Sequence, residues 1–360
     1  MGIGKENQDG SFPGTAFGSA SASRVLQSRP LIPHRCPIPD ARPQGMAEGA
    51  ARPGLTGSAR NDKLKDGGMR TARSQRNRTA LFFAVPIIRG IRKGPDFMPI
   101  QKREFHCYRN CLRIRGTVFF PEGGENLPAA VVSHGFMSNR RSVFPYARAL
   151  AEAGFAAFCF DFCGGGLICA SEGSRRNMSV LTEVEDLKQV IRFALNQPDT
   201  DGKTLILMGC SQGGTVSALT AAELKEAVRG LILLYPALSI PDDARKGQMI
   251  GAKFDPEHIP DRLQCGPMPL GRRYVEDVIG MDINQAIAGY TGSVRILHGD
   301  RDEIVDAEYS RQAARAWCNA GADVRCTIIR GGDHGFSKRV HRDYAAEQAA
   351  AFARQLTAES

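Results

Sequence analysis

The feature that most constrains the fold of this chain is a series of short apolar runs, each about as long as a β-strand. The runs are Ala129–Val132, Phe155–Phe160, Leu205–Met208, Leu231–Leu234, Val294–Leu297 and Cys326–Ile329. Strands that are buried on both faces of a parallel sheet have this almost continuous apolar composition. Helical patterns separate and follow them at residues 141–153, 179–197, 212–227, 306–320 and 338–356. The alternation predicts an α/β fold whose sheet is mostly parallel and doubly wound, in one domain.

The clearest helical pattern covers residues 179–197. Its apolar positions fall on one stripe, at Val180, Val184, Leu187, Ile191 and Leu195. Three carboxylates, Glu183, Glu185 and Asp186, lie near its N-terminal end. Because the helix dipole favours negative charge at that end, we attribute these carboxylates to the dipole.

Two segments depart from the simple alternation. Glu104–Arg109 and Leu112–Phe120 resemble short strands that meet around Asn110, which predicts an N-terminal hairpin. Residues 239–291, between two apolar runs, are longer than a simple crossover and contain five prolines. Long insertions at strand ends commonly form lids or binding loops, so we predict a cap over a site. The alternative is an extra helical pair that only packs on the sheet.

The first quarter of the chain has a different composition. Residues 1–97 contain 16 Lys+Arg and 7 Asp+Glu, so they hold the whole net charge of +9, and the rest of the chain is balanced. With 13 Gly and 9 Pro and no periodic pattern, this extension is predicted to be disordered. One alternative is a basic arm that binds nucleic acid or an anionic surface. Another is that translation starts at Met98, directly before the first strand pattern.

The cysteines and the apolar runs indicate the cellular setting. Ten cysteines in 360 residues are below the density of a disulfide scaffold, and no C-x-x-C pair occurs. Several lie inside apolar runs, as Cys159 does, which is typical of reduced thiols packed as small apolar side chains. We therefore expect a cytoplasmic protein without metal or cofactor. No apolar stretch approaches about 18 residues, so a membrane-spanning helix is excluded.

The strongest chemical signal is a G-x-S-x-G motif centred on Ser211. It follows the apolar run Leu205–Met208 and opens a helical pattern, which is the strand–turn–helix context of a nucleophile elbow. Glycines at 209 and 213 leave room for a tight turn that exposes the Ser211 hydroxyl. The alternative, a glycine-rich turn that cradles phosphate, lacks both G-K-[ST] and G-x-G-x-x-G.

A serine nucleophile needs a base, and the base needs an orienting acid. On an elbow scaffold the acid and then the histidine follow the serine, each in a loop after a later strand. His334 lies in a glycine-rich turn after Cys326–Ile329 and is the predicted base, whereas His341 is expected at the surface of the last helix. Asp300 and Asp302 both follow Val294–Leu297, and spacing alone does not separate them.

Two other aspartates near these loops are weaker candidates for the acid. Asp333 adjoins the base in sequence, and Asp306 begins a helix, where N-capping explains it. The oxyanion of an acyl-transfer intermediate needs two N–H donors, from the residue after the nucleophile and from the loop after an earlier strand. These positions predict the main-chain N–H groups of Gln212 and Phe136. His134 precedes the nucleophile and is predicted to be structural.

Four motifs together resemble those of the α/β-hydrolase superfamily: His134-Gly135-Phe136, Gly209-Cys210-Ser211-Gln212-Gly213-Gly214, His298-Gly299-Asp300-Arg301-Asp302 and Asp333-His334-Gly335-Phe336. Within it, residues 103–356 resemble the cinnamoyl/feruloyl esterase-like and serine aminopeptidase-like hydrolases, and residues 1–97 have no counterpart. The resemblance implies that the H-G-x-x-D-x-x-V pattern places the acid at Asp302. It also implies a cap that shapes an acyl pocket. The chain departs from the F-D-x-R-G-x-G-x-S segment of such enzymes, because Cys163 stands at the arginine position and three glycines follow it.

These observations predict a serine hydrolase that cleaves small-molecule carboxylic esters through an acyl-enzyme. Aromatic acyl esters such as hydroxycinnamates are one candidate substrate class. An aminopeptidase-like amide hydrolase and an acyltransferase are alternatives on the same fold, although no acidic anchor for a peptide amino terminus is identifiable. The alternative to an enzyme is a protein that binds nucleic acid through the basic extension.

Overall fold

The computed structural model describes residues 81–85 and 98–358, and within them nine strands form the main sheet. The order is β1-β13-β12-β7-β6-β4-β5-β3-β2. The strands are β1 (Leu81–Val85), β2 (Ile100–Arg109), β3 (Leu112–Pro121), β4 (Leu127–Ser133), β5 (Ala156–Phe160), β6 (Thr200–Cys210), β7 (Gly230–Leu234), β12 (Ser293–Gly299) and β13 (Asp323–Ile329). β3 runs antiparallel to both β2 and β5, and the other neighbours are parallel. The predicted α/β fold and N-terminal hairpin are confirmed.

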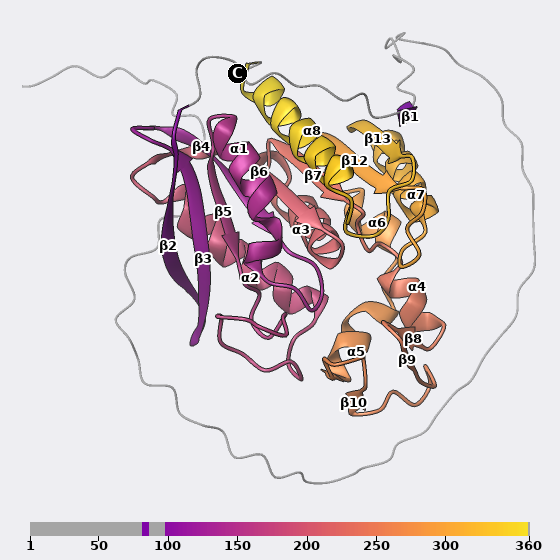
Figure 1. The fold of residues 1–360 in the computed structure, drawn as a ribbon. Helices are drawn as coiled ribbons and strands as arrows, with labels where there is room; N and C mark the ends of the chain where they lie inside the picture. Colours follow the sequence, from indigo (N-terminus) through magenta and orange to yellow (C-terminus); the bar gives the residue numbers. More distant parts are fainter. Residues whose placement is uncertain (1–80, 86–97, 359–360) are drawn as a thin grey trace, which may run out of the picture. The chain divides into compact units, whose positions relative to one another are not determined.

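Helices cover both faces of this sheet (Figure 1). One layer contains α1 (Phe144–Glu152) and α8 (Arg339–Ala358), which pack on each other. The other contains α2 (Val180–Leu195), α3 (Gln212–Leu224) and α7 (Ala307–Asn319). Short 3-10 turns, Arg140–Val143 and Lys225–Ala227, precede α1 and follow α3.

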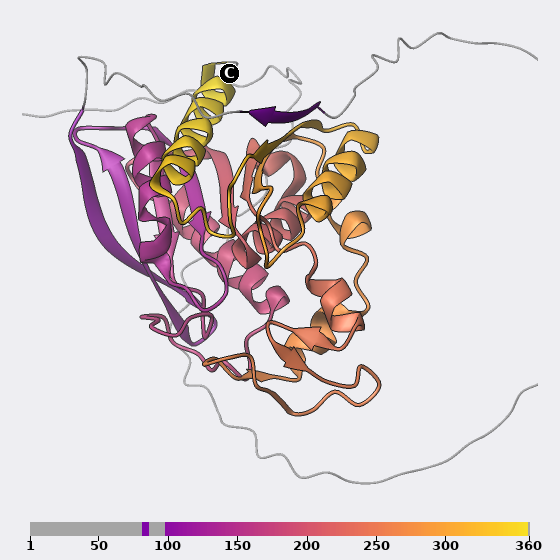
Figure 2. The same cartoon turned by 45° about the vertical axis from the view of Figure 1, so that its right-hand side comes forward.

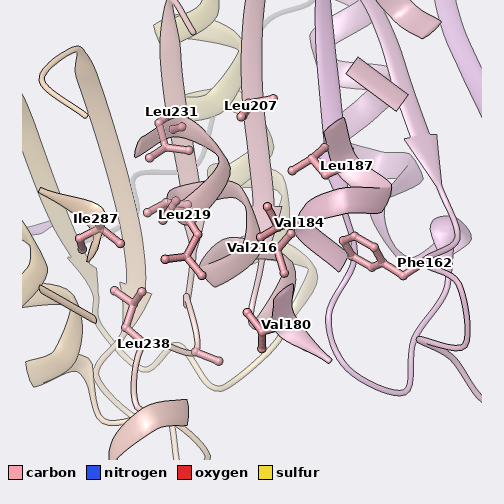
Figure 3. Packing of buried hydrophobic residues seen from close by; sticks show 14 of the residues in the cluster. Phe162, Val180, Val184, Leu187, Leu207, Val216, Leu219, Leu231, Leu238 and Ile287 are labelled. Atoms are coloured by element: carbon pink, nitrogen blue, oxygen red, sulfur yellow. The ribbon is translucent and has the colours of Figure 1, made fainter. Parts of the chain in front are cut away.

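Alternate residues of the central strands pack against opposite helical layers. In β4, Ala129 and Val131 join the cluster under α2 and α3, whereas Ala130 and Val132 join the cluster under α1 and α8. This follows from the two-residue period of side chains along a strand. Figure 3 shows the first cluster, where helix residues meet strand residues at Val184, Leu187, Val216, Leu219, Leu207 and Leu231. Burial on both faces explains why these strands are apolar throughout.

Strand β1 corrects part of the expectation for the N-terminal extension. Residues 1–97 were expected to be disordered, yet Leu81–Val85 pairs in parallel with β13 at the edge of the sheet. Its apolar run is long enough for a strand. The strand forms by main-chain hydrogen bonding to β13, which is distant in the sequence, so no pattern near residues 81–85 indicates it. The prediction is therefore wrong for these five residues, and the rest of the segment lies outside the described residues.

Residues 239–291 lie between β7 and β12. They form α4 (Ile240–Arg245), β8 (Gln248–Met249), β9 (Ala252–Lys253), β10 (Arg262–Leu263), β11 (Leu270–Gly271), α5 (Arg273–Ile279) and α6 (Ile283–Ile287). Figures 1 and 2 show α4, α5 and the small hairpins beyond one end of the sheet. In contrast, α6 packs on α3 and α7. None of the helices in the described part of the chain is long and apolar enough to cross a membrane.

Candidate functional site

Ser211 occupies a strained turn between β6 and α3. Its φ of 52° and ψ of −123° are uncommon for a residue with a side chain. The turn is fixed by main-chain hydrogen bonds, because the Ser211 N–H donates to Leu234 at 3.0 Å and its carbonyl accepts from Ala237 at 3.0 Å. Gly213 allows the close approach of β4, since a Cβ there would lie 2.3 Å from the His134 carbonyl oxygen. This geometry matches the predicted elbow.

Three loops bring Ser211, His334 and Asp302 together. Ser211 Oγ lies 2.9 Å from His334 Nε2, and His334 Nδ1 lies 2.8 Å from Asp302 Oδ2. The loops follow β6, β13 and β12, which end at the same edge of the parallel part of the sheet. The imidazole of His334 also packs edge-on against Tyr235, with ring centroids 5.0 Å apart. A hydroxyl, an imidazole and a carboxylate thus form one hydrogen-bonded series.

The surroundings of Asp302 keep its carboxylate ionised. Its Oδ1 accepts the main-chain N–H groups of Ile304 and Val305, each at 2.9 Å, and its Oδ2 lies 3.0 Å from His298 Nε2. Burial alone would raise the pKa of Asp302. Hydrogen bonds from His298, His334 and the Val305 N–H outweigh burial and hold that pKa well below its usual range. Asp302 is therefore a fixed acceptor for the His334 Nδ1–H.

The structure gives the other acidic and histidine candidates different positions. Asp300 is exposed, and its Oδ1 accepts the Gly331 N–H at 2.6 Å. Asp333 accepts the main-chain N–H four residues later at 2.9 Å, and Asp306 caps α7. His341 was expected at the surface, but it is buried, as are Ala345 and Ala349 one and two turns later in α8. None of these side chains contacts Ser211 or His334 within the described residues.

Phe136 and Gln212 each have a main-chain N–H group that regular secondary structure does not use. Gln212 is the first residue of α3, so its N–H has no acceptor within the helix. The Phe136 N–H, in the loop after β4, has no hydrogen-bond acceptor among the described residues. Both residues line the same cleft as Ser211 and His334. The structure therefore places both predicted donors at the cleft.

The cleft above Ser211 has a volume of about 590 Å³. Its apolar lining is Phe136, Met137, Ala237, Ile240, Met249, Ile250, Ile304 and Val305. Polar groups also line it, at Ser239, Asp243, Gln248 and Glu303. Several of these residues belong to the 239–291 segment, so this segment forms one wall of the cleft.

The loop after β5 supports the loop that carries Phe136. Buried Asp161 accepts the main-chain N–H of Arg140 at 2.7 Å and pairs with its guanidinium at 2.6 Å. His134 is also structural, as predicted, because its buried Nε2 accepts the Phe162 N–H at 3.2 Å. Cys163, at the position where similar enzymes have arginine, donates its main-chain N–H to Asp186 at 2.8 Å.

For two buried polar residues near the site, the sequence predicted no role in the site. His298 directly follows the apolar part of β12 and contacts Asp302, so a histidine at a strand end was the available signal. Glu183 was attributed to the helix dipole, but it is buried and accepts a hydrogen bond from the Gln212 side chain at 2.7 Å. Its contact is with Gln212 on α3, and no pattern in the sequence around Glu183 indicates that contact.

Comparison with known proteins shows which families this chain resembles. Residues 125–266 match the family model of the serine aminopeptidases S33. Est1E of Butyrivibrio proteoclasticus, whose structure was solved with ferulic acid bound, superposes with a TM-score of 0.64 and 26% identity. This superposition covers 71% of the present chain and 99% of Est1E. The chain belongs to the α/β-hydrolase superfamily.

Relatives of this α/β hydrolase match it over shorter stretches. An uncharacterised 31.7 kDa protein of Escherichia coli is 37% identical over 95 residues, which cover 26% of this chain and 32% of that protein. Human monoglyceride lipase is 32% identical over 139 residues, which cover 38% of this chain and 44% of the lipase. The matched stretches thus span less than half the length of either relative. Together with the Est1E match, the lipase match supports an esterase- or lipase-like hydrolase.

Proposed function

We propose that this α/β hydrolase is a serine hydrolase that cleaves carboxylic esters through an acyl-enzyme. The observation that carries the proposal is the hydrogen-bonded series from Ser211 through His334 to Asp302, with distances of 2.9 and 2.8 Å. A serine hydroxyl is a weak nucleophile until a base accepts its proton, and this series supplies the base and its orienting acid. The apolar cleft over Ser211 supplies space for an acyl group.

In the proposed reaction, Ser211 Oγ attacks the ester carbonyl carbon while His334 Nε2 accepts the hydroxyl proton. Asp302 accepts the Nδ1–H and stabilises the imidazolium that forms. The tetrahedral intermediate collapses, the C–O bond to the alcohol breaks, and His334 returns the proton to the leaving alkoxide. Water then attacks the acyl-serine with the same histidine as base, and release of the acid regenerates the Ser211 hydroxyl.

The negative oxygen of each tetrahedral intermediate would be held by the N–H groups of Phe136 and Gln212. Preorganised donors of this kind stabilise charge as it develops in the transition state. The positive end of the α3 dipole lies at Gln212, the first residue of the helix, and acts in the same direction.

We infer further that the 239–291 segment acts as a cap over the site. Two of its residues, Ile240 and Met249, line the cleft, which supports this role. Asp243 also lines it and offers a carboxyl that can accept a hydrogen bond from a phenolic hydroxyl. Together with the similarity to Est1E, these groups favour an aromatic acyl ester such as a hydroxycinnamate.

We also infer that the protein is cytoplasmic. Support comes from buried free thiols, which are the state expected of cysteines in a reducing compartment. They are Cys107, Cys159, Cys163, Cys210, Cys265 and Cys326.

Labelling by an alkyl fluorophosphonate tests the nucleophile. We expect the full-length protein to gain one phosphonyl group, located by peptide mass spectrometry on Ser211, and to lose hydrolysis of p-nitrophenyl butyrate in parallel. The physical reason is that the reagent mimics the tetrahedral intermediate and needs an activated serine. Labelling of another residue, with Ser211 unmodified and activity lost, would refute the assignment.

A substrate panel tests the ester preference. We expect hydrolysis of p-nitrophenyl butyrate and methyl ferulate, and no cleavage of aminoacyl anilides, by full-length protein. Cleavage of the anilides at a comparable kcat/KM would instead favour the amide hydrolase. Acyl transfer to an added alcohol in place of water would favour the acyltransferase.

His298 is expected to position Asp302. It is buried between Ser310 Oγ, 2.7 Å from Nδ1, and Asp302 Oδ2, 3.0 Å from Nε2. Replacing His298 with leucine removes one donor to the carboxylate, so we expect kcat for p-nitrophenyl butyrate to fall about tenfold. Ser310→Ala keeps the donor to Asp302 and should have a smaller effect. A wild-type kcat in a folded His298→Leu protein would show that the contact is dispensable.

A further inference from the structure

A chain of buried polar side chains lies directly behind Gln212. The Gln212 side chain donates from Nε2 to Glu183 Oε2 at 2.7 Å and accepts, at Oε1, a hydrogen bond from the Tyr274 hydroxyl. The three residues are at most 1% exposed and come from α3, α2 and α5. The side-chain amide is therefore fixed at both its oxygen and its nitrogen. The proposed mechanism uses the main-chain N–H of Gln212 and none of these side-chain contacts.

Glu183 is an unusual group to place in this position. Its second oxygen, Oε1, is buried and has no hydrogen-bond partner within the described part of the chain. Gly165 leaves the space that this oxygen fills, since a Cβ at residue 165 would lie 2.6 Å from it. A buried polar atom without a partner is destabilising and calls for an explanation. An apolar side chain would fill the space without that cost, so packing alone does not account for Glu183.

We propose that Glu183 is a positioning residue for the oxyanion site. Its carboxyl holds the Gln212 side chain from α2 while Tyr274 holds it from α5, and together they fix the first turn of α3. The side chain and the main-chain N–H of Gln212 share one Cα, so anchoring the amide at both ends limits rotation of that N–H away from the oxyanion. The inference rests on the proposed function, because the N–H has this task only if Ser211 attacks an ester and a tetrahedral intermediate forms.

Glu183 performs this role as a neutral carboxylic acid. An ionised oxygen without a hydrogen-bond donor in a buried site would be strongly disfavoured. Burial raises the pKa of the Glu183 carboxyl well above its ordinary value of 4.5, the Gln212 hydrogen bond opposes this, and nearby Asp186 adds to it. The titratable groups that face it are Asp186 on α2 and the Tyr274 hydroxyl on α5. Arg109 pairs with Asp186, so that cation does not neutralise Glu183.

A neutral group also suits the chemistry. The tetrahedral intermediate carries negative charge beside the Gln212 N–H. An ionised Glu183, hydrogen-bonded to the side chain of the same residue, would repel that charge and destabilise the intermediate. The neutral acid accepts the same hydrogen bond from Gln212 without that repulsion.

Two substitutions at Glu183, made in the full-length protein, separate this role from packing. Glu183→Gln keeps a neutral carbonyl acceptor for Gln212, so kcat for p-nitrophenyl butyrate should stay within about threefold of wild type. Glu183→Leu has no acceptor, so kcat should fall about 10- to 100-fold while KM changes little. Gly165→Ala crowds the carboxyl and should resemble Glu183→Leu. The matched control is Glu185→Gln, an exposed neighbour on α2, which should leave kcat unchanged.

The pH dependence provides a second readout. A carboxyl whose pKa is raised on folding keeps in the folded state a proton that the unfolded chain releases. Stability from this group is therefore present below pH 4.5 and is lost as pH rises toward the raised pKa. We expect the melting temperature of wild type to fall, relative to Glu183→Gln, as pH rises above 4.5. Wild-type kcat should also fall at the pH where Glu183 ionises, and Glu183→Gln should not show that fall.

The outcomes are distinct. The inference would be overturned if Glu183→Gln lost as much activity as Glu183→Leu. It would also be overturned if a folded Glu183→Leu protein kept the wild-type kcat. If Glu183→Leu does not fold, the pH comparison of wild type with Glu183→Gln decides, and superimposable kcat and melting profiles would overturn it. Failure of the proposed function is separate, because the wild-type protein itself would then neither react with fluorophosphonate nor hydrolyse the ester.

Discussion

Replacing Ser211 with alanine is expected to lower kcat for p-nitrophenyl butyrate by about 10⁴-fold or more. The Oγ atom forms the acyl bond in the proposed mechanism, and no other hydroxyl is hydrogen-bonded to His334 within the described residues. The fold should survive, because main-chain contacts to Leu234 and Ala237 hold the turn and alanine keeps them. The measurements are the single-turnover rate constant, the steady-state kcat, and the melting temperature by circular dichroism.

Ser217→Ala is the matched control for this substitution. Ser217 lies on the same helix, α3, and its buried hydroxyl has no hydrogen-bond partner within the described residues. Removing it should leave kcat unchanged and stability no lower, because no hydrogen bond is lost. Wild-type hydrolysis by Ser211→Ala would exclude Ser211 as the nucleophile, and an equal loss in Ser217→Ala would attribute the effect to packing of α3.

The central strands could be predicted from the sequence because a strand buried on both faces is apolar along its whole buried length. The ends of the strands could not be predicted in this way. The run Leu205–Met208 marks the buried part of β6, but β6 begins at Thr200, which pairs with Leu127 through main-chain hydrogen bonds that polar residues also make. Hydropathy therefore located the strands, and pairing with a neighbour set their ends.

The site was predictable to the extent that its groups follow strands in a fixed order. Asp300 and Asp302 are two residues apart in the same loop, and their order in the chain could not decide between them. In the structure the loop buries Asp302 beside His298 and leaves Asp300 exposed at Gly331. The burial of Glu183 depends on Gly165 and Gln212, which belong to other elements. Such contacts between distant segments arise only when the chain has folded.

Replacing Asp302 with asparagine is expected to lower kcat by about 10⁴-fold while the positions of the side chains are kept. The N–H groups of Ile304 and Val305 point at Oδ1, so the amide oxygen of asparagine should stay there and its NH₂ should take the place of Oδ2. That NH₂ would face His334 Nδ1 and can only donate to it. The imidazole would then carry its proton on Nε2 and could no longer accept the proton of Ser211.

Asp300→Asn is the control that the chain itself offers for this prediction. Asp300 accepts a single main-chain N–H, from Gly331, and an amide oxygen can accept it equally well. Its kcat should remain within about threefold of wild type, because the imidazole of His334 keeps its tautomer. A large loss in Asp300→Asn with near-normal activity in Asp302→Asn would reverse the assignment of the acid. Fluorophosphonate labelling rates, which report activation of Ser211 without product release, should follow the same order as kcat in the two variants.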